Sequence, residues 1–102
     1  MKVAKVTEIR KKKHERRILI AQGEHFFTKA SVAQFAITNQ ELNVGDEVII
    51  AGPSTGEERF IMNEFKVNGQ NVSKATIGDK VTFTVPFRVR LSDKMFVVQK
   101  EN

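Results

Sequence analysis

The stretch from Glu41 to Pro53 limits the fold of this chain more than any other segment. Its apolar residues fall on an even spacing, as a strand with one buried face requires. These residues are Leu42, Val44, Val48 and Ile50. Gly45-Asp46 interrupts the pattern where a tight turn or bulge is needed, because glycine tolerates positive φ and aspartate can bond to nearby backbone. Gly52-Pro53 then closes the strand, since proline has no N–H to donate to a ladder.

Two later turn signals favour the same type of fold. Asn68-Gly69 separates two β-like runs, and this dipeptide suits a type I′ hairpin turn, in which both central residues have positive φ. Gly78-Asp79 repeats the glycine–aspartate pair and leads into residues 80–85, where polar and apolar side chains alternate. Both signals predict antiparallel strands joined by short turns.

Further strands are expected from the remaining apolar and alternating runs, with a distortion at Gly23, a bulge within residues 30–37 and an edge or break at Pro86. The ranges are 18–27, 30–37, 60–67, 87–91 and 95–99. A total of about seven or eight short strands at roughly 8–12-residue spacing is typical of a barrel or sandwich. The sequence therefore predicts an all-β fold, a small antiparallel β-barrel that is closed or nearly closed.

The positive charge of the chain is concentrated at its N-terminus. Residues 1–17 contain eight Lys or Arg and two Glu, a net charge of +6, whereas residues 18–102 carry a net charge of −1. The spacing within residues 1–17 is compatible with a helix or with a short strand. We therefore expect a basic N-terminal arm over residues 1–17, ordered or flexible, and a single β-barrel domain over residues 18–102.

The composition narrows the classes of function and location. The chain has no cysteine, so it has no disulfide, thiol nucleophile or thiolate metal site. No apolar run approaches the roughly 18 residues of a membrane span, and the basic run follows Val3, Val6 and Ile9 instead of preceding them as in a secretory signal. A cytoplasmic protein is the expectation.

Several spaced segments resemble known protein families. Leu42–Val48 and Ala75–Val81 resemble the two Gly-Asp turns in the second domain of translational GTPases such as elongation factor Tu. A closer resemblance over residues 23–98 is to the C-terminal barrel of the collagenase-like peptidase family. The segments that carry it are Gly23–Phe35, Gly52–Gly56 and Arg90–Lys94. That family includes members implicated in RNA hydroxylation, and its chemistry belongs to a large upstream domain, so the resemblance implies an accessory module and no catalytic activity in this chain.

Clustered cations are the best functional signal in the sequence. Lys and Arg side chains displace counterions from a polyanion and so give salt-sensitive, sequence-independent binding. The candidate nucleic-acid-binding residues are Arg10, Lys11, Lys12, Lys13, Arg16, Arg17, Arg88 and Arg90. The alternative for the arm is a solubilising tail or linker, because basic runs of this kind are common.

Other candidate sites have simpler explanations. His14 lies among like charges and His25 lies beside two phenylalanines, so neither forms a metal or catalytic constellation by itself. The loop Gly52–Gly56 lacks the lysine of a phosphate-binding P-loop, and a plain turn is expected there in preference to an anion site. Glu57-Glu58 is expected to carry solvated charges. Phe26, Phe27 and Phe87 are expected in the core in preference to a stacking surface.

The sequence thus predicts a non-catalytic accessory module, without cofactor or metal, that binds RNA or a ribonucleoprotein. The alternative is a protein-docking module that associates with a catalytic subunit or with a second copy of itself.

Overall fold

The computed structural model of the chain describes residues 14–101 and consists of β-strands and connecting turns, with no helix in that range. The strands are β1 (His14–Phe27), β2 (Val32–Ile37), β3 (Leu42–Asn43), β4 (Glu47–Gly52), β5 (Gly56–Ile61), β6 (Phe65–Val67), β7 (Gln70–Val72), β8 (Lys74–Ala75), β9 (Lys80–Thr84) and β10 (Lys94–Glu101). The predicted all-β class is confirmed for these residues.

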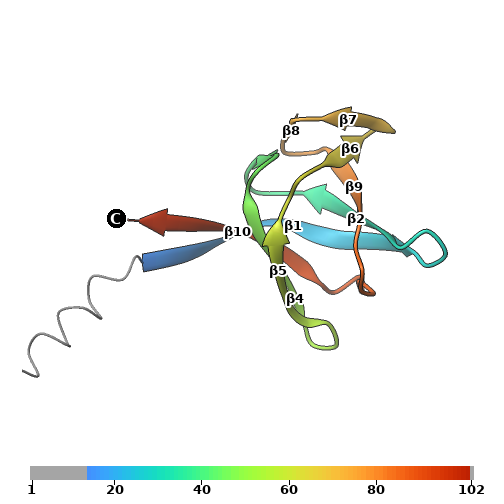
Figure 1. Cartoon of the computed structure of the whole chain (residues 1–102), viewed down its shortest axis with the longest axis horizontal. Helices are drawn as coiled ribbons and strands as arrows, with labels where there is room; N and C mark the ends of the chain where they lie inside the picture. The colour runs from blue at the N-terminus through green and yellow to red at the C-terminus, as the bar shows by residue number, and fades with distance from the viewer. Residues whose placement is uncertain (1–13, 102) are drawn as a thin grey trace, which may run out of the picture.

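Eight of the strands form one antiparallel sheet in the order β5-β4-β10-β1-β2-β9-β6-β7, and β3 pairs with β8 in a second, two-stranded sheet. The large sheet curls strongly around its interior (Figure 1). The described ladders do not join its two edge strands, β5 and β7, to one another. The structure therefore shows an antiparallel sheet but not its closure into a barrel.

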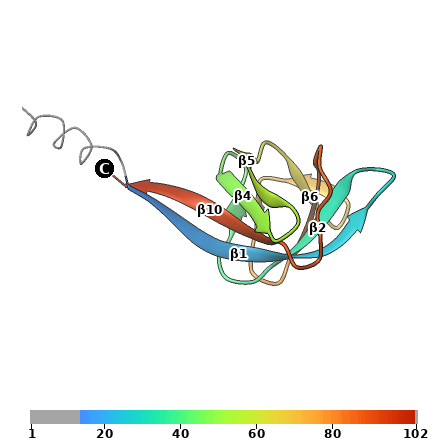
Figure 2. The same cartoon turned by 90° about the horizontal axis from the view of Figure 1, so that it is seen from below.

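Strands β1 and β10 extend together beyond the rest of the sheet (Figures 1 and 2). They pair from Gln22↔Lys94 out to His14↔Glu101, whereas β4 pairs with β10 only as far as Val48↔Val97. We call the projecting part, residues 14–17 paired with residues 98–101, the β1–β10 ribbon. At its other end β1 turns into β2 through a hairpin that projects in the opposite direction (Figure 2). A single long strand thus runs from one end of the molecule to the other.

The core lies on the inner face of the curled sheet. Phe35 and Phe83 stack there with their ring centroids 5.7 Å apart, and Phe65 is 1% exposed. Every second residue of β2 is buried, and β9 shows the same alternation, because successive side chains of a strand point to opposite faces. Phe26 and Phe87 pack against this core as expected, while Phe27 is 44% exposed and does not.

The predicted turns are confirmed. Asn68 and Gly69 have φ of 54° and 78°, as a type I′ hairpin between β6 and β7 requires. Gly45 and Gly78 have φ of 98° and 97°. Strand β4 ends at Gly52, directly before Pro53. The local residue preferences therefore set the corners of the fold.

The two Gly-Asp corners have the same hydrogen bonds. Oδ2 of Asp46 accepts a bond from the N–H of Asn43 at 2.9 Å, and Oδ2 of Asp79 accepts one from the N–H of Thr76 at 2.8 Å. In both corners the aspartate N–H also donates to the carbonyl three residues earlier. The aspartate is thus the residue that fixes each corner, while glycine allows its positive φ.

Three details of the sequence prediction are wrong. Val44 is 42% exposed because it lies in the turn after β3 and not on the inner face. Residues 60–67 do not form one strand, because the N–H of Met62 donates to Asp46 O and its carbonyl accepts from Gly45, which turns the chain between β5 and β6. The bulge expected within residues 30–37 lies instead in β1, where the register shifts between Leu19 and Ala21 and again between Gly23 and His25. The second shift confirms the distortion expected at Gly23.

The alternating run of residues 87–91 also forms no strand. Its middle residue Val89 is 3% exposed, whereas Leu91 is 61% exposed. The N–H of Arg90 donates to the Asp93 carboxylate and is not free to join a ladder. The alternation of apolar and polar residues over 87–91 therefore marks a loop with Val89 buried at its middle, and not a strand.

Candidate functional site

The candidate cations that the structure describes occupy two separate parts of the molecule. Arg10, Lys11, Lys12 and Lys13 lie outside the described residues. Arg16 and Arg17 belong to β1 on the β1–β10 ribbon, so the described end of the predicted arm, residues 14–17, is part of a strand. Arg88 and Arg90 are exposed on the loop between β9 and β10. The boundary between arm and domain stays a prediction.

Arg17 is partly neutralised by a carboxylate from a distant part of the sequence. Its guanidinium lies 2.8 Å from the Glu57 carboxylate, and both side chains remain about half exposed. A phosphate that bound Arg17 would have to compete with Glu57. Glu57, which was expected to carry a solvated charge, is therefore a half-exposed ion-pair partner on β5.

The loop that carries Arg88 and Arg90 is held by a buried aspartate. Asp93 is 0% exposed, and its Oδ2 accepts hydrogen bonds from the Arg90 N–H at 3.0 Å and from the Thr55 hydroxyl at 2.5 Å. The Asp93 N–H donates back to the Arg90 carbonyl at 3.0 Å. This is the same corner that Asp46 and Asp79 make, here without glycine and with the carboxylate buried.

Three segments meet at Asp93. The N–H of Gly23 in β1 donates to the Asp93 carbonyl at 2.8 Å, and a Cβ at Gly23 would lie only 2.8 Å from the Arg90 carbonyl oxygen. Thr55 joins the β4–β5 turn to the same aspartate. We call this meeting point the Asp93 junction. It brings together the three segments on which the family resemblance was drawn. Gly23 allows the close approach of the Arg90 backbone, and Thr55 donates a hydrogen bond to the buried carboxylate of Asp93.

The Asp93 junction leaves one carboxylate oxygen without a hydrogen bond. Oδ1 is buried and has no partner among the described residues. A Cβ built on Gly52 would lie 1.8 Å from this oxygen, so the carboxylate fills the space beside the Gly52 backbone. The negative charge of Asp93 disfavours anion binding by the Gly52–Gly56 loop, which is consistent with the plain turn that the sequence predicts.

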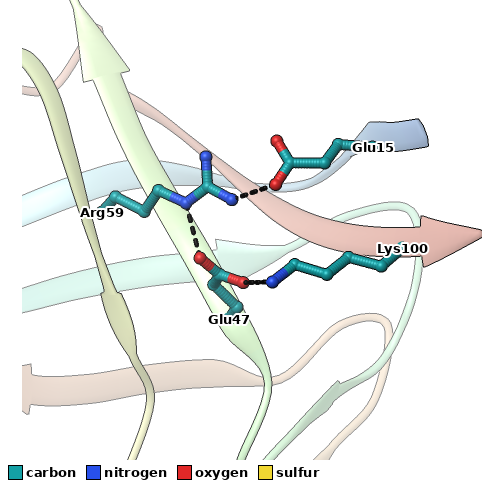
Figure 3. A network of polar contacts seen from close by, with 4 residues as sticks. All are labelled: Glu15, Glu47, Arg59 and Lys100. Atoms are coloured by element: carbon teal, nitrogen blue, oxygen red, sulfur yellow. Dashed lines mark hydrogen bonds and ion pairs between the residues drawn. The ribbon is translucent and has the colours of Figure 1, made fainter. Parts of the chain in front are cut away.

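A second polar cluster attaches the β1–β10 ribbon to the β4–β5 hairpin (Figure 3). Arg59 on β5 donates to Glu15 of the ribbon and, at 2.5 Å, to Glu47 on β4. Lys100 of the ribbon lies 3.5 Å from Glu47. The hydrogen bond from Arg59 lowers the pKa of Glu15 and of Glu47 below the ordinary value and raises that of Arg59. No local sequence pattern reveals this cluster, because even its directly bonded residues Glu15 and Arg59 are 44 positions apart.

His25 and the remaining carboxylates are the other candidates for a metal or catalytic site among residues 14–101. Within residues 14–101, no three His, Cys, Asp or Glu side chains lie close enough to hold a metal ion. His25 packs against Phe27 on the β1–β2 hairpin, with ring centroids 4.3 Å apart. A hollow of about 280 Å³ between β6 and β9 is lined by Glu64 and Lys66 and does not include His25.

The sequence is similar to that of curated proteases. It is 37% identical over 84 residues to a collagenase of Porphyromonas gingivalis strain W83, and 27% identical over 85 residues to the uncharacterized protease MJ0090 of Methanocaldococcus jannaschii. These stretches cover 82% and 83% of this chain but only 20% and 21% of the relatives. No family model matches the chain.

The fold is shared with a solved domain of the same family. The C-terminal domain of a putative U32 peptidase from Geobacillus thermoleovorans superposes with a TM-score of 0.70 at 20% identity, covering 83% of this chain and 93% of that one. Its selenomethionine variant gives a TM-score of 0.71 and covers 98% of that chain. The chain matches the C-terminal domain of the U32 peptidase and collagenase family.

The predicted resemblance to this family is thereby confirmed. The U32-type domain described here spans about a fifth of the length of the curated relatives that it matches. The more distant likeness to a translation-factor domain stays a prediction. Among residues 14–101 of the U32-type domain, no helix is long and apolar enough to cross a membrane.

Proposed function

We propose that this chain is a non-catalytic accessory module of the U32 type and that it binds RNA through the basic residues of its N-terminal segment and of the loop between β9 and β10. The observation that carries the proposal is the segregation of charge. Residues 14–101 contain eleven basic and eleven acidic side chains, so the whole net charge of +5 comes from residues 1–13. A basic segment joined to a neutral folded domain is suited to hold a polyanion without fixing its sequence.

The coverage of the relatives supports an accessory role. The chain spans about a fifth of the curated proteins named collagenase or protease, which leaves most of their length to hold a reaction centre. The same coverage is expected of a domain that binds or positions a substrate. We propose further that the curled sheet forms a nearly closed barrel. We also propose that the module works in the cytoplasm, where RNA partners are found.

The folded domain adds two exposed arginines to this proposal. Arg88 and Arg90 lie on the loop fixed by Asp93, and neither makes an ion pair within residues 14–101. Because the loop is held by a buried carboxylate, the backbone that carries these cations is fixed before a ligand arrives. Arg17 contributes less, since its charge is shared with Glu57.

Salt-dependent RNA binding tests the proposal. The triple variant Lys11→Ala, Lys12→Ala, Lys13→Ala should bind a labelled 20-nucleotide single-stranded RNA more weakly, and the slope of log K against log salt should become shallower by about 2, at roughly 0.7 per lost phosphate contact. The control Lys66→Ala, Lys74→Ala, Lys80→Ala removes the same charge from strands β6, β8 and β9. Equal binding by both triple variants and the wild type would refute the role of the basic arm.

A second candidate function is docking to another protein. It is favoured by the large apolar side chains that the described surface exposes. These are Phe27, Val44, Ile61, Ile77 and Leu91. A defined protein partner, or a second copy of the chain, that stays bound in high salt after nuclease treatment would support this function over RNA binding.

A further inference from the structure

The tip of the β1–β2 hairpin carries an aromatic pair that the core does not use. Phe27 and His25 are both exposed, and their rings meet edge to face with centroids 4.3 Å apart. Lys29 is exposed two residues further on. The hairpin projects from the sheet at the end opposite the β1–β10 ribbon (Figure 2). The pair and the lysine are thus presented together to solvent.

The fold does not account for the exposed ring of Phe27. Phe26 packs against the core, so the next residue along the strand must point to the other face. A polar residue at position 27 would satisfy that geometry, yet the position holds a phenylalanine that is 44% exposed. An exposed aromatic ring at a projecting tip is a feature of binding surfaces.

The backbone around the tip is constrained. Ser31 has φ of 55°, an uncommon value for a residue other than glycine, and its N–H donates to the Thr28 carbonyl at 3.4 Å. The Ser31 carbonyl accepts a hydrogen bond from the Val85 N–H at 2.9 Å, which ties the base of the tip to the end of β9. The aromatic pair is therefore carried on a defined turn.

We propose that this tip binds an unpaired base of single-stranded RNA, with the Phe27 ring stacked on the base, His25 beside it and Lys29 at a neighbouring phosphate. The proposal rests on the proposed function in that RNA is the ligand, and it adds a second contact that reads the base face instead of the phosphate charge. Aromatic side chains with adjacent cations are the usual elements of single-strand recognition.

Charge favours RNA over an apolar protein surface as the occupant. Residues 25–31 include a lysine and no carboxylate. The preceding Glu24 is engaged by Gln34 at 3.0 Å and by Lys80 at 3.5 Å, so its charge is shared with a cation away from the tip. The tip thus offers aromatic surface and positive charge together.

The tip and the basic arm are independent sites. Arg16 and Arg17, in the described part of the arm, lie toward the opposite end of β1 from the tip, and the 14 residues of β1 span about 45 Å at roughly 3.3 Å per residue. A short oligonucleotide can occupy the tip without reaching the arm, while a long one can reach both and bind more tightly through their combined effect. The two contributions can be measured separately.

The test uses the full chain and a labelled eight-nucleotide oligoadenylate, with an abasic oligomer of the same phosphate number as a second probe. Phe27→Ala should weaken oligoadenylate binding about tenfold and leave the salt slope unchanged, because stacking carries no counterion release. Phe27→Trp should retain affinity. The control Ile77→Ala removes a side chain that is 62% exposed on the turn between β8 and β9, outside the proposed RNA contacts, and should bind like the wild type. The abasic oligomer should bind equally to the wild type and to Phe27→Ala.

The outcomes separate this inference from the proposed function. If the Lys11–Lys13 triple variant binds RNA more weakly but Phe27→Ala binds as Ile77→Ala does, the tip site is refuted and the proposed function stands. If Phe27→Ala alone weakens binding, the tip site is supported and the role of the arm is refuted. If the wild type binds neither RNA, or if Phe27→Ala loses a protein partner instead, the stacking site is refuted.

Discussion

Oδ1 of Asp93 occupies the space beside the Gly52 backbone where any other residue would place its Cβ, at a distance of 1.8 Å. The adjacent oxygen, Oδ2, holds Thr55 and the Arg90 backbone. The absence of a side chain at position 52 therefore decides whether the β4–β5 turn and the loop before β10 can meet. This dependence is directly testable.

Gly52→Ala should destabilise the domain by about 1–3 kcal/mol, the usual cost of forcing extra volume into a packed site. Denaturant unfolding of the purified chain gives the free energy of unfolding for the comparison. The clash is with a side chain, so it should be weaker when that side chain is shortened. In the background of Asp93→Ala, Gly52→Ala should cost less than it does in the wild type. Equal costs in both backgrounds would place the strain elsewhere.

Thr55→Val should destabilise the domain by about 1.5–3 kcal/mol, because valine keeps the shape but removes a hydrogen bond to a charged, buried carboxylate. Its neighbour Ser54 is exposed and serves as the control, since Ser54→Ala should change stability by less than about 0.5 kcal/mol. Urea unfolding of the two variants measures both values. If the two substitutions have the same effect, the Thr55 bond contributes nothing to the Asp93 junction.

The Arg59 cluster should contribute to stability only where its carboxylates are ionised. Glu15 and Glu47 have folded pKa values below their ordinary value of 4.5 because Arg59 donates hydrogen bonds to them. A carboxylate whose pKa is lower in the folded than in the unfolded protein stabilises the fold at pH values above 4.5, where it is ionised in both states. This stabilisation is lost as the pH falls through the pKa of the folded state. Arg59→Ala should therefore unfold at a lower temperature than the wild type at pH 7 and at nearly the same temperature in strong acid.

Salt and a second arginine provide the controls for that experiment. The cluster is at the surface, so the effect at pH 7 should be small and should shrink further in 1 M salt, where the Debye length is about 3 Å. Arg88→Ala, which removes an arginine without an ion pair in residues 14–101, should show no such pH dependence. A difference between wild type and Arg59→Ala that persisted in strong acid would show that Arg59 acts through packing.

The sequence could predict the corners of this fold because each depends on one or two adjacent residues. Asn68-Gly69 and the Gly-Asp pairs adopt their turns for local reasons, and the structure confirms them. The alternation of polar and apolar residues was less reliable. It predicts which side chains are buried but not whether a partner strand is present. Val89 is buried in a loop, and the run around it was expected to be a strand.

The candidate site was harder to predict, because its decisive contacts link distant segments. Arg17 meets Glu57 across 40 residues, which no local pattern of charge reveals. Asp93 entered the sequence analysis only within the segment Arg90–Lys94, and its sequence neighbours do not show that it is buried against Gly52. Phe27 was expected in the core because adjacent phenylalanines do not indicate which of the two faces inward. These features follow from packing between strands.

The Gly-Asp corner at Asp79 should be stabilised by the acceptor oxygen of the aspartate and not by its charge. Its carboxylate accepts from the Thr76 N–H at 2.8 Å. Asp79→Ala should cost about 0.5–1.5 kcal/mol, the net value of one such bond, because water can reach the exposed Thr76. Asp79→Asn keeps an oxygen in the same place and removes the charge, so urea unfolding should place it within about 0.5 kcal/mol of the wild type. If Asp79→Asn instead costs as much as Asp79→Ala, the negative charge at this corner stabilises the fold and the hydrogen bond is not its source.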